Sequence, residues 1–208
     1  MKKVLLFGNK TAQYHPVSNI ESCIRKLVAE GELETTDNPM SLRLDNLNHY
    51  EFCIFYPEFG MPELTDEQTG SLLAYVSSGG KLLVIHNGIS LQSRSEICQM
   101  IGAAFTGHPP YDTLPQINYH VEAPGHPLMN GIIDFVMGDE PYQFIIDSFA
   151  ASQLLMSCDF EGKRLPAAWI RKYGRGDVIY YACGHNHEAF ENPNFVRILK
   201  NTVLYFKK

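Results

Sequence analysis

The sequence has no long hydrophobic run, few cysteines and no cluster of basic residues. No apolar stretch approaches the roughly 20 residues of a transmembrane helix, so we expect no membrane partner. The five cysteines are scattered over 208 residues without a C-x-x-C pair, which disfavours a disulfide framework or a thiolate zinc site and favours a reducing cytoplasm. A formal net charge of -6 argues against a nucleic-acid-binding face.

Several catalytic motifs are also missing. The sequence contains no H-E-x-x-H pair and no G-x-S-x-G nucleophile elbow. The stretch Gly8-Asn9-Lys10-Thr11 lacks the other glycines of a phosphate-binding loop. The N-terminus has a basic start but only a short apolar run without a small-residue cleavage site, so it predicts a first strand and not a signal peptide.

The overall composition, 45% hydrophobic and 19% charged, is typical of a soluble globular protein. Short apolar runs bounded by turn residues predict buried parallel strands, and amphipathic stretches between them predict helices. The expected strands of the first half are 3–7, 33–36, 52–56 and 82–85. Capping boxes at Thr65-Asp66-Glu67-Gln68 and Ser93-Arg94-Ser95-Glu96 predict the starts of two of the helices.

The second half of the chain has a more antiparallel character. Residues 105–110 predict a loop, and strands are expected over 117–122, 143–146 and 154–157. The strands 167–173 and 177–183 flank Gly174-Arg175-Gly176, a three-residue hairpin loop. Asn192 followed by Pro193 predicts the start of a last amphipathic helix. With no repeat and no linker, residues 1–208 are expected to form one domain.

Histidines at predicted strand ends are the best candidates for chemistry. His86 follows the buried strand 82–85, at the carboxyl edge where ligands bind in open α/β sheets. His185-x-His187-Glu188 places three titratable groups after the last strand, and Asp139-Glu140 precedes another strand. His86 and His185 are expected to approach each other across this edge, where imidazole serves as a general base or a metal ligand.

The other histidines are weaker candidates. His108 and His126 each lie between glycine and proline, where a turn alone explains them. His120 alternates within a strand and His49 lies in a polar stretch, so both are expected to be structural or solvated. His15 lies near the edge beyond the first strand, without a motif that assigns it a role.

Eight segments, in order over nearly the whole chain, resemble the ThuA-like family, named for a trehalose-utilisation protein. They are Leu64-Thr65-Asp66-Glu67-Gln68, Gly79-Gly80-Lys81-Leu82-Leu83-Val84-Ile85-His86, Phe105-Thr106-Gly107-His108-Pro109, His126-Pro127-Leu128, Asp139-Glu140-Pro141-Tyr142, Pro166-Ala167-Ala168-Trp169, Gly184-His185 and Asn192-Pro193-Asn194-Phe195.

The resemblance implies a flavodoxin-like, class I glutamine amidotransferase-like three-layer α/β sandwich. It implies a mostly parallel central sheet, with antiparallel strands in the C-terminal half. In amidotransferases the strand that matches 82–85 carries a cysteine nucleophile, whereas His86-Asn87 stands here. Glutamine amidotransferase activity is therefore not expected. The resemblance also implies a role in the metabolism of disaccharides or oxidised sugars, although fold analogy does not supply the reaction.

Three hypotheses follow for a small-molecule sugar ligand. The first is an enzyme with histidine/carboxylate acid–base chemistry, in which His86 is the base and His185 and Glu140 complete the catalytic group. The second is a hydrolase in which some of His86, His108, His185 and Glu140 hold a divalent metal ion that activates water, which leaves the cofactor open. The third is a non-catalytic carbohydrate-binding or assembly module, and a homo-oligomer stays open. Candidate substrate-binding residues are His108, Asn87, Tyr142, His187, Glu188 and Trp169, with Tyr111 as a further aromatic that could stack on a sugar.

Overall fold

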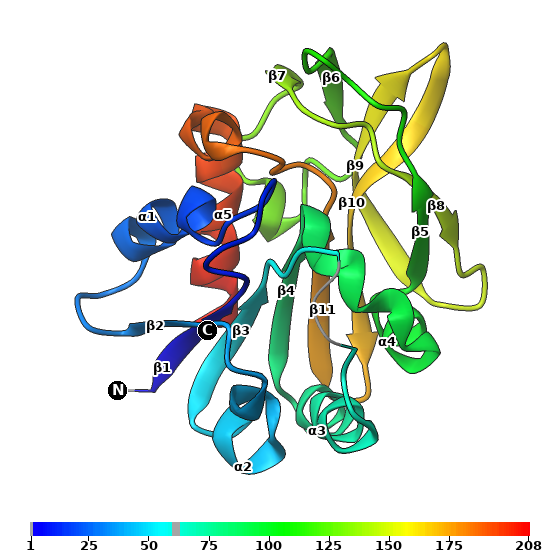
Figure 1. Cartoon of the computed structure of the whole chain (residues 1–208). Helices are drawn as coiled ribbons and strands as arrows, with labels where there is room; N and C mark the ends of the chain where they lie inside the picture. The colour runs from blue at the N-terminus through cyan, green and yellow to red at the C-terminus, as the bar shows by residue number, and fades with distance from the viewer. Residues whose placement is uncertain (1, 60–62) are drawn as a thin grey trace.

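The computed structural model describes residues 2–59 and 63–208. Its central feature is a nine-stranded sheet in the order β2-β1-β3-β4-β11-β10-β9-β6-β7. The half that carries the first strands of the chain is parallel throughout (Figure 1). Its members are β1 (Lys3–Phe7), β2 (Leu33–Thr36), β3 (Tyr50–Phe55), β4 (Lys81–Ile85) and β11 (Gly176–Tyr181).

The other half of the sheet is antiparallel. Strand β11 pairs parallel with β4 on one side and antiparallel with its neighbour β10 on the other. The remaining members are β10 (Lys163–Tyr173), β9 (Ser152–Phe160), β6 (Gln116–Val121) and β7 (Phe135–Gly138). A separate antiparallel pair consists of β5 (Ala103–Gly107) and β8 (Gln143–Ile146). The mixed architecture predicted from the sequence is confirmed.

Helices cover both faces of the parallel half (Figure 1). On one side α1 (Ser18–Leu27) contacts α5 (Pro193–Phe206), and on the other α2 (Leu44–Leu47), α3 (Asp66–Ser77) and α4 (Ser95–Ile101) follow one another. Short 3₁₀ segments complete the fold: η1 (Pro39–Leu42), η2 (His86–Ser93), η3 (Pro127–Met129) and η4 (His187–Glu191). Across residues 2–59 and 63–208, no helix is long and apolar enough to span a membrane.

Two local predictions for the second half were wrong. Residues Ala103–Gly107 form strand β5, so the predicted loop begins later than expected. This strand escaped prediction because it pairs only with β8, about 40 residues later, and shows no alternation of its own. The loop of the β10–β11 hairpin has two residues and not three, because Tyr173 pairs with Gly176.

The two predicted capping boxes have different outcomes. Thr65 accepts a hydrogen bond from the backbone N–H of Gln68 at 3.2 Å, and the Gln68 side chain accepts one from the Thr65 N–H at 3.0 Å. The second box does not form, because α4 begins after Arg94 without a side-chain cap. Ser93 is the last residue of the 3₁₀ segment η2, so it does not occupy the N-cap position of α4.

We therefore expect Thr65→Ala to destabilise the protein by about 1 kcal/mol, since the first turn of α3 loses a hydrogen-bond acceptor. Ser93→Ala is the matched control, and its free energy of unfolding should equal that of the wild type within about 0.5 kcal/mol. Urea denaturation followed by circular dichroism measures both variants. Equal losses in the two variants would contradict the assignment of the cap to Thr65.

Candidate functional site

The site begins at a sharp turn between β4 and η2. His86 adopts a left-handed backbone conformation with φ of 44°, which is uncommon outside glycine. The chain passes very close to the neighbouring strand here: a Cβ atom on Gly88 would lie 2.3 Å from the carbonyl oxygen of Phe55. The Tyr180 hydroxyl donates to the carbonyl of His86 at 3.0 Å. These contacts present the His86 side chain at the carboxyl edge of the sheet.

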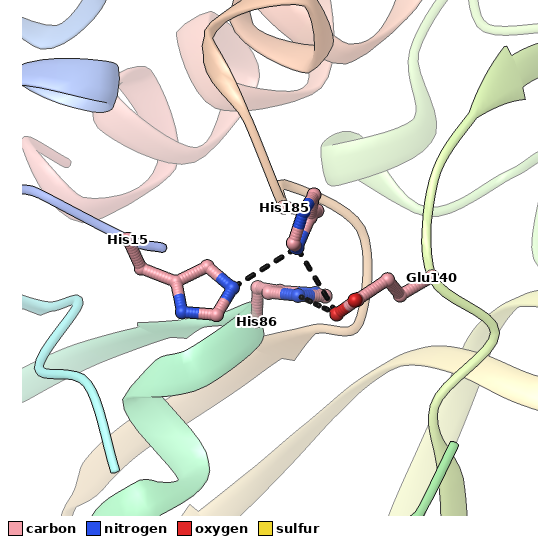
Figure 2. Close-up of side chains that lie close together, drawn as sticks. All are labelled: His15, His86, Glu140 and His185. Atoms are coloured by element: carbon pink, nitrogen blue, oxygen red, sulfur yellow. Dashed lines mark hydrogen bonds and ion pairs between the residues drawn. The ribbon is translucent and has the colours of Figure 1, made fainter. Parts of the chain in front are cut away.

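Other strand ends deliver more polar side chains to the same edge. His15 lies in the connection after β1, and Glu58 follows β3. His185 comes shortly after β11, and Glu140 lies between β7 and β8. Figure 2 shows the imidazoles of His15, His86 and His185 and the carboxylate of Glu140 converging from separate segments. We call these four residues the His/Glu centre.

Short distances join the members of the His/Glu centre. His185 Nδ1 lies 3.0 Å from both His15 Nε2 and Glu140 Oε2. His86 Nε2 lies 3.3 Å from the same Glu140 oxygen. The expected approach of His86 to His185 is present, with ring centroids 5.5 Å apart. One ligand atom from each residue lies within 4.8 Å of every other, a spacing that allows a shared proton or a shared cation.

A buried carboxylate holds two of the segments together. Asp139 Oδ2 accepts the backbone N–H of Gly184 at 2.8 Å, and Oδ1 accepts those of His185 at 3.2 Å and Glu140 at 2.8 Å. The Tyr56 hydroxyl donates to the Gly184 carbonyl at 2.7 Å. The positions of Glu140 and His185 thus depend on one side chain that itself has no exposed surface.

Burial and charge shift the pKa values of the centre in different directions. Burial, reinforced by the neighbouring His86 and His185, lowers the pKa of His15 to about 3. Burial also opposes the charged form of His185, yet its pKa is raised because Glu140 accepts its hydrogen bond. The pKa of Glu140 is lowered: burial acts against this, but the hydrogen bonds of His185 and His86 outweigh it. Burial raises the pKa of Asp139.

The His/Glu centre opens onto a pocket of about 500 Å³. Its floor includes Glu140, His15 and His185, whereas the ring of His86 has no exposed surface and lies behind them. Aromatic rings and polar groups form the walls: Tyr14, Glu58, Phe59, Phe105, His108, Pro110, Tyr111 and Tyr142. A polar floor under aromatic walls is a common arrangement in small-molecule sites.

His108 and Tyr142, both predicted to bind substrate, belong to this pocket. The ring of Tyr142 stacks on that of His86 with centroids 3.9 Å apart and on that of His108 at 5.3 Å. His108 Nδ1 donates to the carbonyl of Pro109 at 2.8 Å, which leaves Nε2 toward Glu140, 3.6 Å away. The side chain of His108 is 27% exposed, so a ligand in the pocket can reach it.

Four other candidate residues lie away from the pocket. Asn87 is fully buried and donates to the carbonyl of Tyr56 at 3.0 Å. Trp169 lies in the core, where its indole N–H donates to Ile101 at 2.8 Å and its ring stacks on that of Tyr180. His187 is exposed and pairs with Glu191 at 3.2 Å, and Glu188 lines a separate hollow beside β7. Among the described residues that line the pocket, none is one of these four.

No role could be assigned to His15 from the sequence, and Glu58 was not among the candidate residues. Glu58 accepts the backbone N–H groups of Tyr14 at 3.4 Å and His15 at 3.3 Å, so it positions the loop that carries His15. Its place just beyond the buried strand 52–56 was an available signal, since β3 ends at the same edge as β4. His15 lies several residues beyond β1, too far for the strand to indicate its direction.

A family model described as "Trehalose utilisation" matches residues 3–206. The chain belongs to the ThuA family. Membership supports a role in sugar metabolism. No curated protein sequence matches the chain.

Several solved structures share the fold of this chain. A ThuA-like protein from Bacteroides uniformis superposes with a TM-score of 0.82 at 18% identity, over 99% of this chain and 91% of that one. A cytoplasmic protein from Salmonella typhimurium LT2 gives 0.68 at 13% identity, over 99% and 100%. Part of a cold-adapted β-galactosidase from Rahnella sp. R3 gives 0.67 at 14% identity, over 100% of this chain and 31% of the enzyme. At these identities the likeness establishes the fold alone.

Proposed function

We propose that this ThuA-family chain is an enzyme that acts on a sugar by acid–base chemistry at Glu140, His185 and His86. The observation that carries the proposal is the convergence of these three side chains, two of which, Glu140 and His185, line one pocket. Glu140 and His185 are the members a substrate can reach, so the carboxylate is the better-placed base and His86 positions it. Proton abstraction beside a sugar carbonyl, leading to isomerisation or elimination, suits this set.

The absence of a nucleophile at the turn supports this choice over acyl-transfer chemistry. Position 86 corresponds to a nucleophile elbow by its strand-to-3₁₀ turn and positive φ, but it presents an imidazole. The nearby hydroxyl of Ser90 donates to the carbonyl of Pro57 at 2.9 Å and is engaged there. Burial raises the pKa of the Cys183 thiol well above its usual value, so this cysteine is not an activated thiolate.

The pocket has properties that fit a sugar. Its volume lies within the range of about 300–1,000 Å³ usual for small-ligand sites. Tyr111 and Phe105 offer ring surface for the apolar face of a sugar, and Glu58 and His108 offer hydrogen-bonding groups for hydroxyls. We place Tyr142 and His108 among the substrate-binding residues and leave Asn87, Trp169, His187 and Glu188 outside the pocket.

The proposal also covers the domain organisation and the cellular location of the enzyme. We propose that residues 1–208 act as one domain, since buried apolar side chains from both halves of the chain form one core. We also propose a cytoplasmic location, which suits five free cysteines and matches the description of a Salmonella protein of the same fold.

A proton-transfer assay tests the proposal. Purified protein is incubated in D₂O with trehalose, other disaccharides and their oxidised (keto) derivatives, and ¹H NMR follows loss of C–H signals and formation of product. We expect turnover of at least one sugar, and Glu140→Gln should reduce it at least about a hundredfold because the base is lost. His86→Ala should also reduce turnover at least about a hundredfold.

Glu188→Gln provides the control, since this carboxylate is exposed and outside the pocket. It should retain the wild-type rate. Full activity in both Glu140→Gln and His86→Ala would refute the assigned chemistry. Sugar binding without turnover, unaffected by either substitution, would instead indicate a carbohydrate-binding module.

A further inference from the structure

Hydrogen-bond directions in the His/Glu centre leave lone pairs facing one another. The carbonyl of Ala182 only accepts, so the proton of neutral His86 is on Nδ1, which donates to it at 2.5 Å. The lone pair of His86 Nε2 therefore faces the carboxylate of Glu140, which also only accepts. Two things can bridge these atoms 3.3 Å apart: a proton on Nε2, which makes His86 an imidazolium that donates to Glu140, or a bound cation that both atoms ligate.

A second contact of the same kind lies beside the first. His15 Nε2 and His185 Nδ1 are 3.0 Å apart, and His185 Nδ1 is equally close to Glu140 Oε2. One proton on His185 Nδ1 can point at only one of these neighbours. His15 Nδ1 is buried on the far side of its ring, 3.7 Å from Glu58 Oε1, so a proton there leaves Nε2 as a lone pair directed into the centre.

The spacing matches that of ligands around one metal ion. Nitrogen and carboxylate ligands lie roughly 2.0–2.2 Å from a zinc-type ion, so ligands of the same ion stand roughly 3–4 Å from one another. The measured separations of 3.0 and 3.3 Å fall in this range. Within the described residues, one ligand atom from each of the four lies within 4.8 Å of all the others.

The surroundings also resemble those of metal-binding histidines. Such histidines donate their second ring N–H to a carbonyl or a carboxylate, which fixes the ring and its tautomer. His86 has the Ala182 carbonyl in this position. His15 Nδ1 makes no hydrogen bond with the described residues, and the carboxylate oxygen Oε1 of Glu58 lies 3.7 Å away. The pocket reaches the centre from the side of His15, Glu140 and His185, so an ion there would have a position open to a ligand.

We propose that His15, His86, His185 and Glu140 bind one divalent ion of the zinc type. Three imidazoles favour zinc, cobalt, nickel or iron(II) over magnesium or calcium, which prefer oxygen ligands. Neutral imidazoles and one carboxylate leave a net single positive charge at the base of the pocket. If the proposed sugar chemistry holds, this charge would polarise a substrate oxygen, and the Glu140 oxygen that does not bind the ion would exchange the proton.

Metal titration of the intact chain tests the site without any sugar. Protein dialysed against EDTA, then against chelator-free buffer, is titrated with ZnCl₂ by calorimetry and with CoCl₂ by visible absorption. We expect one ion per chain, Co²⁺ ligand-field bands, and no comparable binding of MgCl₂. His15→Gln and His185→Gln should each weaken Zn²⁺ binding at least about tenfold, and Glu58→Gln should weaken it by about tenfold through His15.

His120 offers a matched control for binding by exposed histidines. Its two ring nitrogens contact different carboxylates, Nδ1 with Asp134 at 3.0 Å and Nε2 with Asp159 at 2.8 Å, so one ion cannot take that whole set. His120→Gln should leave the Zn²⁺ affinity unchanged. Circular dichroism verifies that each variant is folded.

The outcomes separate this inference from the proposed function. Failure to bind Zn²⁺ or Co²⁺, or unchanged affinity in the folded double variant His15→Gln/His185→Gln, would overturn the metal site. Loss of binding in His120→Gln would assign the ion to the surface and overturn it equally. Stoichiometric binding that depends on His15 and His185 supports the site even when no sugar is turned over, a result that would remove only the proposed reaction.

Discussion

Asp139→Ala should lower the free energy of unfolding by at least about 3 kcal/mol and displace both Glu140 and His185. The substitution removes the acceptor for three backbone N–H groups, those of Gly184, His185 and Glu140. Each buried donor left without a partner costs about 1–3 kcal/mol. Chemical denaturation measures the loss, and a change in the slope of the transition would show whether the native state has also loosened.

Two further variants serve as comparisons for Asp139→Ala. Asp139→Asn preserves the size of the side chain and one acceptor oxygen, so it should be less destabilising than Asp139→Ala by about 1 kcal/mol. Asp45→Ala, at an exposed carboxylate, should change stability by no more than about 0.5 kcal/mol. If Asp139→Ala were as mild as Asp45→Ala, the carboxylate would not be what joins the two segments.

Gly88→Ala should destabilise the protein by about 2–3 kcal/mol, because the added Cβ meets the Phe55 carbonyl oxygen at 2.3 Å and a side chain of β4 at 3.0 Å. Backbone atoms cannot move aside as a flexible side chain can. The 3₁₀ turn must therefore shift, and the His86 ring with it. Thermal denaturation should show a fall of the midpoint by roughly 2–4 °C for each kcal/mol lost.

Gly70→Ala is the opposite case in the same fold. Gly70 lies in α3, and a Cβ there would have open space around it. Because alanine favours the helix over glycine by up to about 1 kcal/mol, this variant should be more stable than the wild type. A stability loss at both glycines would mean that the close contact beneath His86 does not determine the effect.

Ligands of open α/β sheets bind beyond the carboxyl ends of the strands, and this rule was enough to predict from the sequence that His86 and His185 lie at one site. His86 and His185 follow strands whose apolar runs are plain, and parallel neighbours end at one edge, so their proximity could be predicted. Glu140 was found for a different reason, as part of an acidic pair before a short strand. Its actual position depends on the hydrogen bonds of Asp139, which no local pattern encodes.

Other positions around the site depend on tertiary contacts that a local sequence pattern does not encode. His15 lies in an irregular connection whose direction is set by tertiary contacts with Glu58, so no periodic signal points to it. Trp169 was a candidate for sugar stacking because it is aromatic. An aromatic side chain on a central strand usually packs into the core. In this fold Trp169 does so, and the carbonyl of Ile101 accepts its indole N–H. His187 follows His185 closely, but the 3₁₀ turn of η4 directs it to solvent.

The positive φ of His86 sets stability against the proposed chemistry at that position. A non-glycine residue in this conformation costs of the order of 1 kcal/mol, which a glycine would not incur. The protein nevertheless carries the imidazole there, with its stacking on Tyr142 and its bond to Ala182. A glycine at position 86 would relax the backbone and remove the ring, so fold and chemistry place opposing demands on one residue.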